Sequence, residues 1–140
     1  MSDPLYSRDL LRLAADACAA GRLVTPDVSG VAFNPACGDR VVVDVRLADG
    51  RIAEFAHETR ACVLAQASAS ILGMTLINAN RVTVENLYAY VKIMLAQGSE
   101  PPLPPFEKYA VFSGAAEYTN RHRCVLLPLD AVLDALARSG

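Results

Sequence analysis

The strongest constraint on the fold is an alternating pattern on either side of Asp49-Gly50. Over residues 40–47, valines at every second position share one face of an extended segment, which is the period of a half-buried β-strand. Asp-Gly is a preferred two-residue hairpin turn, and residues 51–59 read as the return strand. With a short strand over residues 28–33, the pattern predicts an antiparallel meander of about three strands, one face of which needs a cover of helices.

Apolar residues at helical spacing, together with capping and stop signals, predict the helices that supply this cover. They are a first helix capped by Ser2 or Asp3 with Pro4 at its first position and a stop at Gly21, a second from about Ala61 to Ile77, a third capped by Thr83 and ending at Gln97-Gly98, a short one from Phe106 to Phe112, and a last one with Pro128 in its first turn.

The composition is that of a globular chain, with 53% hydrophobic and 20% charged residues among 140. We expect one domain over residues 1–140. A net charge of -2 argues against bulk nucleic-acid binding. Every apolar stretch is interrupted by charges and no signal peptide is visible, so no membrane association and a cytoplasmic location are expected. In that compartment the four cysteines are candidates for ligands or reactive thiols rather than disulfides.

The turn at residues 34–39, Asn-Pro-Ala-Cys-Gly-Asp, places a thiol and a carboxylate two positions apart in Cys37 and Asp39. Cys62 and Cys124 lie near predicted helix starts, where backbone N–H groups and the helix dipole favour a thiolate. Three cysteines and a carboxylate could complete a four-ligand set for zinc, copper(I) or an iron–sulfur cluster. The spacing lacks the paired C-x-x-C of zinc fingers, and two other interpretations stay open: cysteines as small buried hydrophobes, which we favour for Cys18, and Asp39 as a turn cap.

Several of these segments resemble one known family. The motif at 34–39 resembles the N-P-x-C-G-D motif of the IscU/SufU/NifU N-terminal family of iron–sulfur cluster assembly scaffolds. Cys62 and the Ala-Ser-Ala-Ser at 67–70 are similar to that family's C-x-x-x-x-A-S-x-S helix, residues 21–26 to its first-helix exit, and residues 121–124 more loosely to its third-cysteine segment.

The resemblance implies an α+β fold, with a three-stranded antiparallel sheet and helices packed mainly on one face. It also implies a site formed by Cys37, Asp39, Cys62 and Cys124, and docking with a cysteine desulfurase that delivers persulfide sulfur. Two departures from IscU, Arg123 in place of a histidine and a longer interval between Cys62 and Cys124, are similar to the SufU branch, which is associated with zinc and sulfur transfer. An L-P-P-V-K motif ahead of Cys124 is absent, so binding to an Hsp70-type chaperone is not carried over.

Three functions follow. The first is a scaffold, rather than a turnover enzyme, that accepts sulfur from a desulfurase, binds iron or a transient Fe–S cluster through the three cysteines and Asp39, and delivers it to apo iron–sulfur proteins. The second is a zinc-bound sulfurtransferase that relays persulfide sulfur, with Cys124, beside Arg121 and Arg123, as the candidate sulfur acceptor. The third is a hydrolase that pairs Cys62 or Cys124 with one of the two histidines, His57 and His122. We expect both histidines at the surface. Ser68 and Ser70 are interpreted as helix-packing residues.

Overall fold

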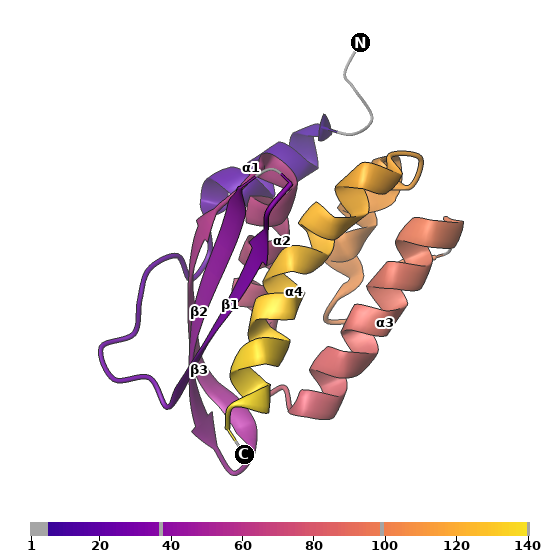
Figure 1. Ribbon diagram of the computed structural model, residues 1–140. Helices are drawn as coiled ribbons and strands as arrows, with labels where there is room; N and C mark the ends of the chain where they lie inside the picture. The colour runs from indigo at the N-terminus through magenta and orange to yellow at the C-terminus, as the bar shows by residue number, and fades with distance from the viewer. Residues whose placement is uncertain (1–5, 37, 99, 140) are drawn as a thin grey trace.

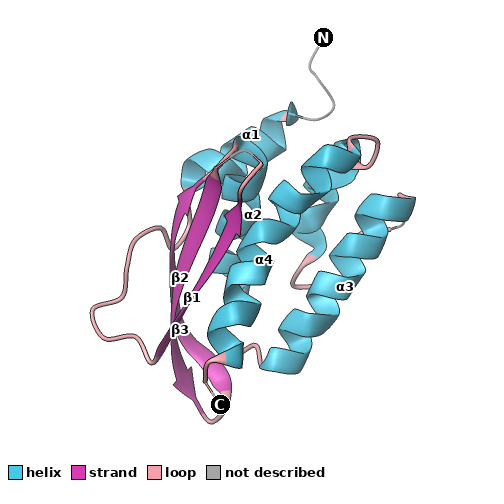
Figure 2. Ribbon diagram, in the orientation of Figure 1, coloured by secondary structure: helices cyan, strands magenta, loops and turns pink. Residues whose placement is uncertain are grey.

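The computed structural model describes residues 6–36, 38–98 and 100–139, and these form a three-stranded antiparallel sheet covered on one face by helices (Figures 1 and 2). The elements, in chain order, are α1 (Arg8–Asp16), β1 (Val28–Asn34), β2 (Asp39–Ala48), β3 (Arg51–Arg60), α2 (Val63–Thr75), α3 (Arg81–Gln97), the 3-10 helices η2 (Glu107–Ala115) and η3 (Thr119–Arg121), and α4 (His122–Ala137). The predicted α+β class and the three strands are confirmed.

The central strand β2 pairs with β1 on one side and with β3 on the other. Val41, Val43 and Val45 of β2 are fully buried on the face toward the helices, as the alternation predicts. The hairpin turn is made by Asp49 and Gly50, both of which have positive φ, the geometry for which Asp-Gly is selected.

The helices form one layer over that face, with α3 as an outer member. Helix α4 packs against β1 and β2, α2 packs against β3, and both α1 and α4 contact α2. Helix α3 contacts α4, so it lies on the far side of α4 from the sheet (Figure 1). In the described residues, no helix is both long and apolar enough to cross a bilayer.

Several helix boundaries differ from the prediction because a different residue caps the helix. Helix α1 is capped by Ser7, whose Oγ accepts the Leu10 N–H, and it ends at Ala17, which takes the left-handed conformation, so the predicted stop at Gly21 was wrong. The predicted cap at Ser2 or Asp3, with Pro4 at the first helical position, lies outside the described residues. The cap of α3 is Asn80, whose side chain accepts the N–H of Thr83, the predicted cap.

Two later elements also differ. The segment predicted as a short helix over 106–112 is a 3-10 helix, Glu107–Ala115. Helix α4 begins at His122, so Pro128 lies inside the helix and not in its first turn. Proline supplies no N–H to the helical ladder, so α4 tolerates a missing hydrogen bond in its N-terminal half.

Candidate metal centre

Three of the four predicted ligands come together at one end of the sheet. One donor atom each from Asp39, Cys62 and Cys124 lies within 4.8 Å of the others, and no other such group of metal-ligating side chains occurs in residues 6–36, 38–98 and 100–139. The fourth predicted ligand, Cys37, lies outside the described residues. The sequence therefore identified three side chains that the fold brings to one point from three different elements.

Asp39 is placed by the turn between β1 and β2. Gly38, at φ +74, donates its N–H to the Asn34 carbonyl at 2.8 Å, and Asn34 Oδ1 accepts the Ala36 N–H at 3.2 Å. Asn34 and Asp39 then form the last pair of the β1–β2 ladder. This closure leaves the Asp39 carboxylate at the end of the sheet, 9% exposed.

Cys62 is the N-cap residue of α2. Its backbone is extended and its carbonyl accepts the Gln66 N–H at 3.0 Å, but its side chain makes no capping hydrogen bond. The side chain of an N-cap residue normally accepts a hydrogen bond from a backbone N–H in the first turn of the helix. The half-buried Cys62 thiol is instead directed to the donor group.

Cys124 lies in the first turn of α4 and is 3% exposed, which makes it the most buried of the three donors. Its Sγ is 4.0 Å from Oδ2 of Asp39. A carboxylate and a thiolate this close, away from water, repel each other unless a cation or proton lies between them. In the structure the Cys124 thiol donates a long hydrogen bond to Asp39, and a cation could take the place of this proton.

The donor chemistry and spacing fit a metal ion. Thiolate sulfur and carboxylate oxygen bind zinc at roughly 2.3 and 2.1 Å, so neighbouring donors of a tetrahedral site lie about 3.5–3.8 Å apart. The separations of at most 4.8 Å need only about 1 Å of contraction. Soft thiolates also suit copper(I) and iron–sulfur clusters, so the donor set selects a soft metal without choosing among them.

Arg123 and His122, which precede Cys124 in the sequence, interact with groups outside the donor group. Arg123 is exposed, and its charge acts on Tyr88 and Asp130, where it partly offsets the raised pKa that burial gives each of them. His122 is half-buried, and its Nε2–H donates to the carbonyls of Ala115 and Ala116 at 3.1 and 3.0 Å. His122 therefore anchors the end of η2.

The prediction that His57 is exposed was wrong, since it is 3% exposed on the inner face of β3, opposite Val43. Its Nε2–H donates to the Cys18 carbonyl and its Nδ1 accepts from Thr59, both at 2.9 Å. Burial lowers the pKa of His57, which favours the neutral ring. With both histidines bonded to these partners, a Cys–His nucleophile pair receives no support.

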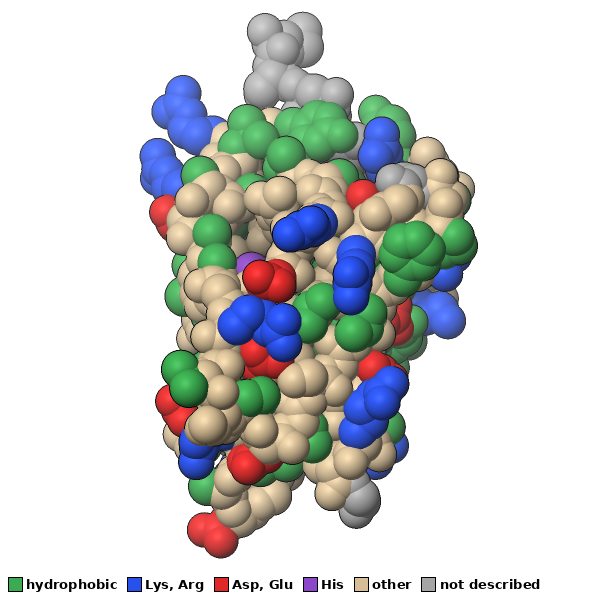
Figure 3. Space-filling model, turned by 60° about the vertical axis from the view of Figure 1, so that its left-hand side comes forward, with side chains coloured by type: hydrophobic (Ala, Val, Ile, Leu, Met, Phe, Trp, Pro, Cys, Tyr) green, Lys and Arg blue, Asp and Glu red, His purple; other side chains and the backbone are tan. Residues whose placement is uncertain are grey.

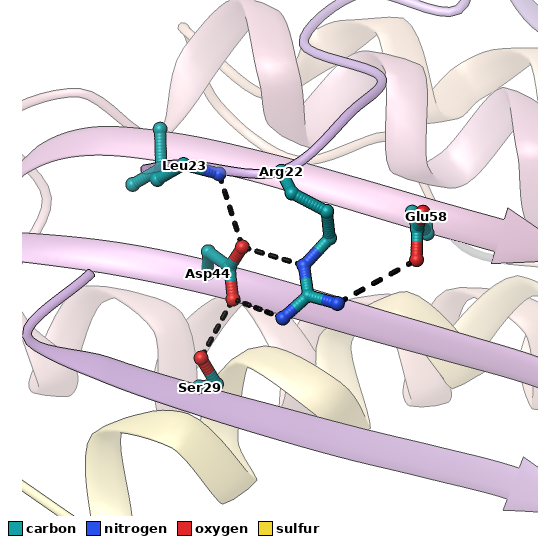
Figure 4. A network of polar contacts seen from close by, with 5 residues as sticks. All are labelled: Arg22, Leu23, Ser29, Asp44 and Glu58. Atoms are coloured by element: carbon teal, nitrogen blue, oxygen red, sulfur yellow. Dashed lines mark hydrogen bonds and ion pairs between the residues drawn. The ribbon is translucent and has the colours of Figure 1, made fainter. Parts of the chain in front are cut away.

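A second polar cluster, which sequence reasoning missed, lies on the open face of the sheet. Figure 3 shows basic, acidic and apolar side chains interspersed on this face, and Figure 4 shows the cluster itself. Arg22 donates from Nε to Asp44 Oδ2 at 2.6 Å and from a second nitrogen to Oδ1 at 3.1 Å, while Ser29 Oγ and the Leu23 N–H also donate to this carboxylate. Glu58 lies 3.7 Å from the same guanidinium. The cluster ties the segment before β1 to the middle of the sheet.

Replacing Asp44 by asparagine is expected to cost about 2 kcal/mol of unfolding free energy at pH 7, because Asp44 is fully buried and hydrogen bonds to charged groups contribute roughly 1.5–3 kcal/mol. The bonds from Arg22, with those from Ser29 and Leu23, hold the pKa of Asp44 below its usual range against the opposing effect of burial. The stability it contributes is therefore present above the pKa of the unfolded chain and is lost as pH falls through the lower folded pKa.

Denaturant unfolding at pH 7 and below pH 4 measures this difference, and the cost of Asp44→Asn should shrink at the lower pH. Glu58→Gln, which weakens a half-exposed ion pair to the same arginine, is the control and should change stability by no more than about 0.5 kcal/mol. A cost for Asp44→Asn that is the same at both pH values would contradict the assignment.

The fold and the donor group together define a small α+β domain with a candidate cysteine and aspartate metal centre. A family model, the NifU-like N-terminal domain, matches residues 5–124. The chain belongs to this family, which confirms the resemblance to the IscU/SufU/NifU family.

Individual relatives agree. The chain is 24% identical over 136 residues to the iron–sulfur cluster assembly scaffold protein IscU of Thermotoga maritima, covering 96% of this chain and 94% of the relative, and 27% identical over 110 residues to the protein of the same name from Streptococcus pyogenes, covering 76% and 67%. Among solved structures, a nitrogen-fixing NifU-like protein (N-terminal) from Brucella abortus superposes with a TM-score of 0.91 at 31% identity, covering 98% of this chain and 94% of that one. A SUF-system scaffold from Fervidobacterium islandicum gives a TM-score of 0.85 at 20% identity, covering 97% and 99%, and so shares the fold.

Proposed function

We propose that this chain, acting as a single NifU N-terminal-like domain over residues 1–140, is a scaffold for iron–sulfur cluster assembly. A cysteine desulfurase supplies the sulfur, Cys37, Asp39, Cys62 and Cys124 hold iron and the growing cluster, and apo iron–sulfur proteins receive it. The observation that carries the proposal is the convergence of Asp39, Cys62 and Cys124 at one end of the sheet. Thiols that must stay reduced suit the cytoplasm.

A donor set of thiolates and one carboxylate suits a cluster that must be released to another protein. Thiolates bind iron firmly, whereas a carboxylate is a harder and weaker ligand for such a cluster. Asp39 therefore provides the exchangeable position. Cys124 is buried and Cys62 is half-buried, so the group opens to the surface on the Cys62 side, where a partner can reach it.

A second candidate function, a zinc-bound sulfur relay, is favoured by one observation. The three described donors already lie close to the spacing around a single tetrahedral ion. When bound, zinc would stabilise the thiolates at neutral pH. In the transfer, a thiolate such as that of Cys124 attacks the terminal sulfur of the desulfurase persulfide; a new S–S bond forms on this chain, the old one breaks, and the desulfurase cysteine leaves as a thiolate.

The metal and acid-labile sulfide content of anaerobically purified protein tests these functions. Iron with matching sulfide, or a cluster absorbance after reconstitution, is the result expected of a scaffold. About one zinc per chain without sulfide, together with a raised desulfurase turnover on adding the protein, would instead establish the relay. The Cys37→Ser variant should lose the bound metal in either case. Absence of metal from the wild-type protein, before and after reconstitution, would overturn both functions.

A further inference from the structure

Two serines of α2, Ser68 and Ser70, are fully buried and bond to different neighbours. Ser68 Oγ donates to the carbonyl of Val125, the residue after Cys124, at 2.7 Å. Ser70 Oγ accepts the backbone N–H of Cys18 at 3.1 Å. The two side chains thus fix α2 to two different parts of the chain, and only Ser68 contacts the segment that carries a predicted ligand.

The Ser68 hydroxyl is held in this direction by Tyr109 of η2. The hydroxyl oxygens of Ser68 and Tyr109 are 2.8 Å apart, and since the single Ser68 proton goes to the Val125 carbonyl, the Tyr109 hydroxyl donates to Ser68 Oγ, with the Ser68 carbonyl as a more distant acceptor at 3.5 Å. Tyr109 is fully buried, and burial raises its pKa, so it remains a proton donor over the physiological range. The result is a directed chain of bonds from Tyr109 through Ser68 to Val125.

This chain of bonds meets α4 near Pro128, which cannot donate a backbone hydrogen bond within the helix. Pro128 lies four residues after Cys124, so it contributes no N–H to the carbonyl of that residue, and its ring crowds the same turn. The first turn of α4 therefore depends more than usual on lateral contacts. Ser68 supplies one of them at the adjacent Val125 carbonyl.

Helix α2 carries Cys62 at its N-cap and Ser68 six residues later, roughly 9 Å along the helix axis. A bond from Ser68 to Val125 consequently fixes the start of α4 against α2, and with it the position of Cys124 relative to Cys62. We propose that Ser68, oriented by Tyr109, is a positioning residue that sets the separation of the Cys62 and Cys124 thiols. Its importance for metal or cluster binding rests on the proposed function.

The separation of the thiols can be measured without metal. In a Cys18→Ala/Cys37→Ser background the remaining cysteines are Cys62 and Cys124. Oxidised glutathione takes two electrons from their thiols, giving one protein disulfide and two reduced glutathiones, and the equilibrium constant reports the effective concentration of one thiol at the other. Ser68→Ala is expected to lower this constant about tenfold.

Ser70→Ala is the matched control. It removes an equally buried hydroxyl from the same helix, so it should destabilise the fold comparably while changing the glutathione equilibrium by less than about twofold. Should Ser68→Ala fail to fold, Ser68→Ala/Tyr109→Phe removes both hydroxyls together and leaves no orphaned donor. An unchanged equilibrium in the Ser68 variants, or an equal loss in Ser70→Ala, would overturn the proposal.

The consequence for the site is tested in the full chain. With cobalt(II) as a spectroscopic probe, Ser68→Ala should bind the ion about tenfold more weakly, within the range typical of residues that orient metal ligands, and Ser70→Ala should bind it as wild type does. Wild-type protein that binds neither cobalt nor zinc would refute the ligand set of the proposed function. The glutathione equilibrium would still decide the role of Ser68.

Discussion

Replacing Cys124 by serine is expected to lower the affinity of the chain for zinc at least about a hundredfold and to abolish cluster reconstitution. Structural zinc sites contribute roughly 10–16 kcal/mol through four ligands, so loss of one thiolate removes about 3 kcal/mol. A serine hydroxyl is not ionised at neutral pH and is a poor ligand for soft metals. Serine nearly matches cysteine in volume, so the change tests the ligand rather than packing at this 3% exposed position.

Cys18→Ser is the control for this experiment. Cys18 lies just beyond the end of α1, where its backbone contacts Ser70 and His57, and it is not part of the donor group. Its replacement should leave zinc affinity, measured by competition with a chromogenic chelator, within about twofold of wild type. Equal losses in the two variants would indicate a general effect of removing thiols, and unchanged affinity in Cys124→Ser would remove this residue from the ligand set.

The strands were predictable because their signals are local. Alternating valines and an Asp-Gly turn act over a few residues, and each strand in the structure matches its predicted bounds to within about one residue. Helix ends were less predictable, since several residues compete for each cap. At the end of α1, Ala17 takes the left-handed conformation at φ 45, which is usually associated with glycine. The sequence pattern favoured Gly21 as the stop, and nothing in the sequence indicated that the helix would end earlier, at an alanine.

Residue spacing and composition alone did not predict that the site forms. Asp39, Cys62 and Cys124 are far apart in sequence, and neither their spacing nor the composition required them to meet. The family motifs grouped them, and the fold explains how they meet: one begins β2, one caps α2 and one lies in the first turn of α4. The group is thus a product of tertiary packing between elements whose individual positions the sequence did indicate.

The exposure of His57 was misjudged, and the hydrogen-bond partner of Ser68 was not foreseen, for one common reason. Both are polar side chains on faces that pack against other elements, and their partners are backbone carbonyls distant in sequence, at Cys18 and Val125. A buried polar group is acceptable when its hydrogen bonds are made, but those partners appear only once the chain has folded. The residue pattern therefore placed His57 at the surface, and it correctly interpreted Ser68 as a helix-packing residue without identifying its partner.

Replacing Gly30 by alanine is expected to destabilise the fold by about 3 kcal/mol or more. A Cβ at this position of β1 would lie 2.2 Å from the Ala131 carbonyl oxygen and 2.4 Å from the Ala135 nitrogen, both backbone atoms of α4. Backbone cannot move aside as a flexible side chain can, so α4 must shift away from the sheet. The same contact region includes a 2.9 Å bond from the Val31 N–H to Asp134, which that shift would strain.

Denaturant unfolding of Gly30→Ala beside Gly50→Ala separates the clash from the effect of losing a glycine. A Cβ at Gly50 would meet no atom within 4 Å, so only its positive φ of 76° opposes the substitution, and about 1 kcal/mol is expected. Because α4 also carries Cys124, the shift caused at Gly30 should weaken zinc binding as well, whereas Gly50→Ala should not. Comparable stability losses in the two variants would mean that α4 does not rest directly on the backbone of β1.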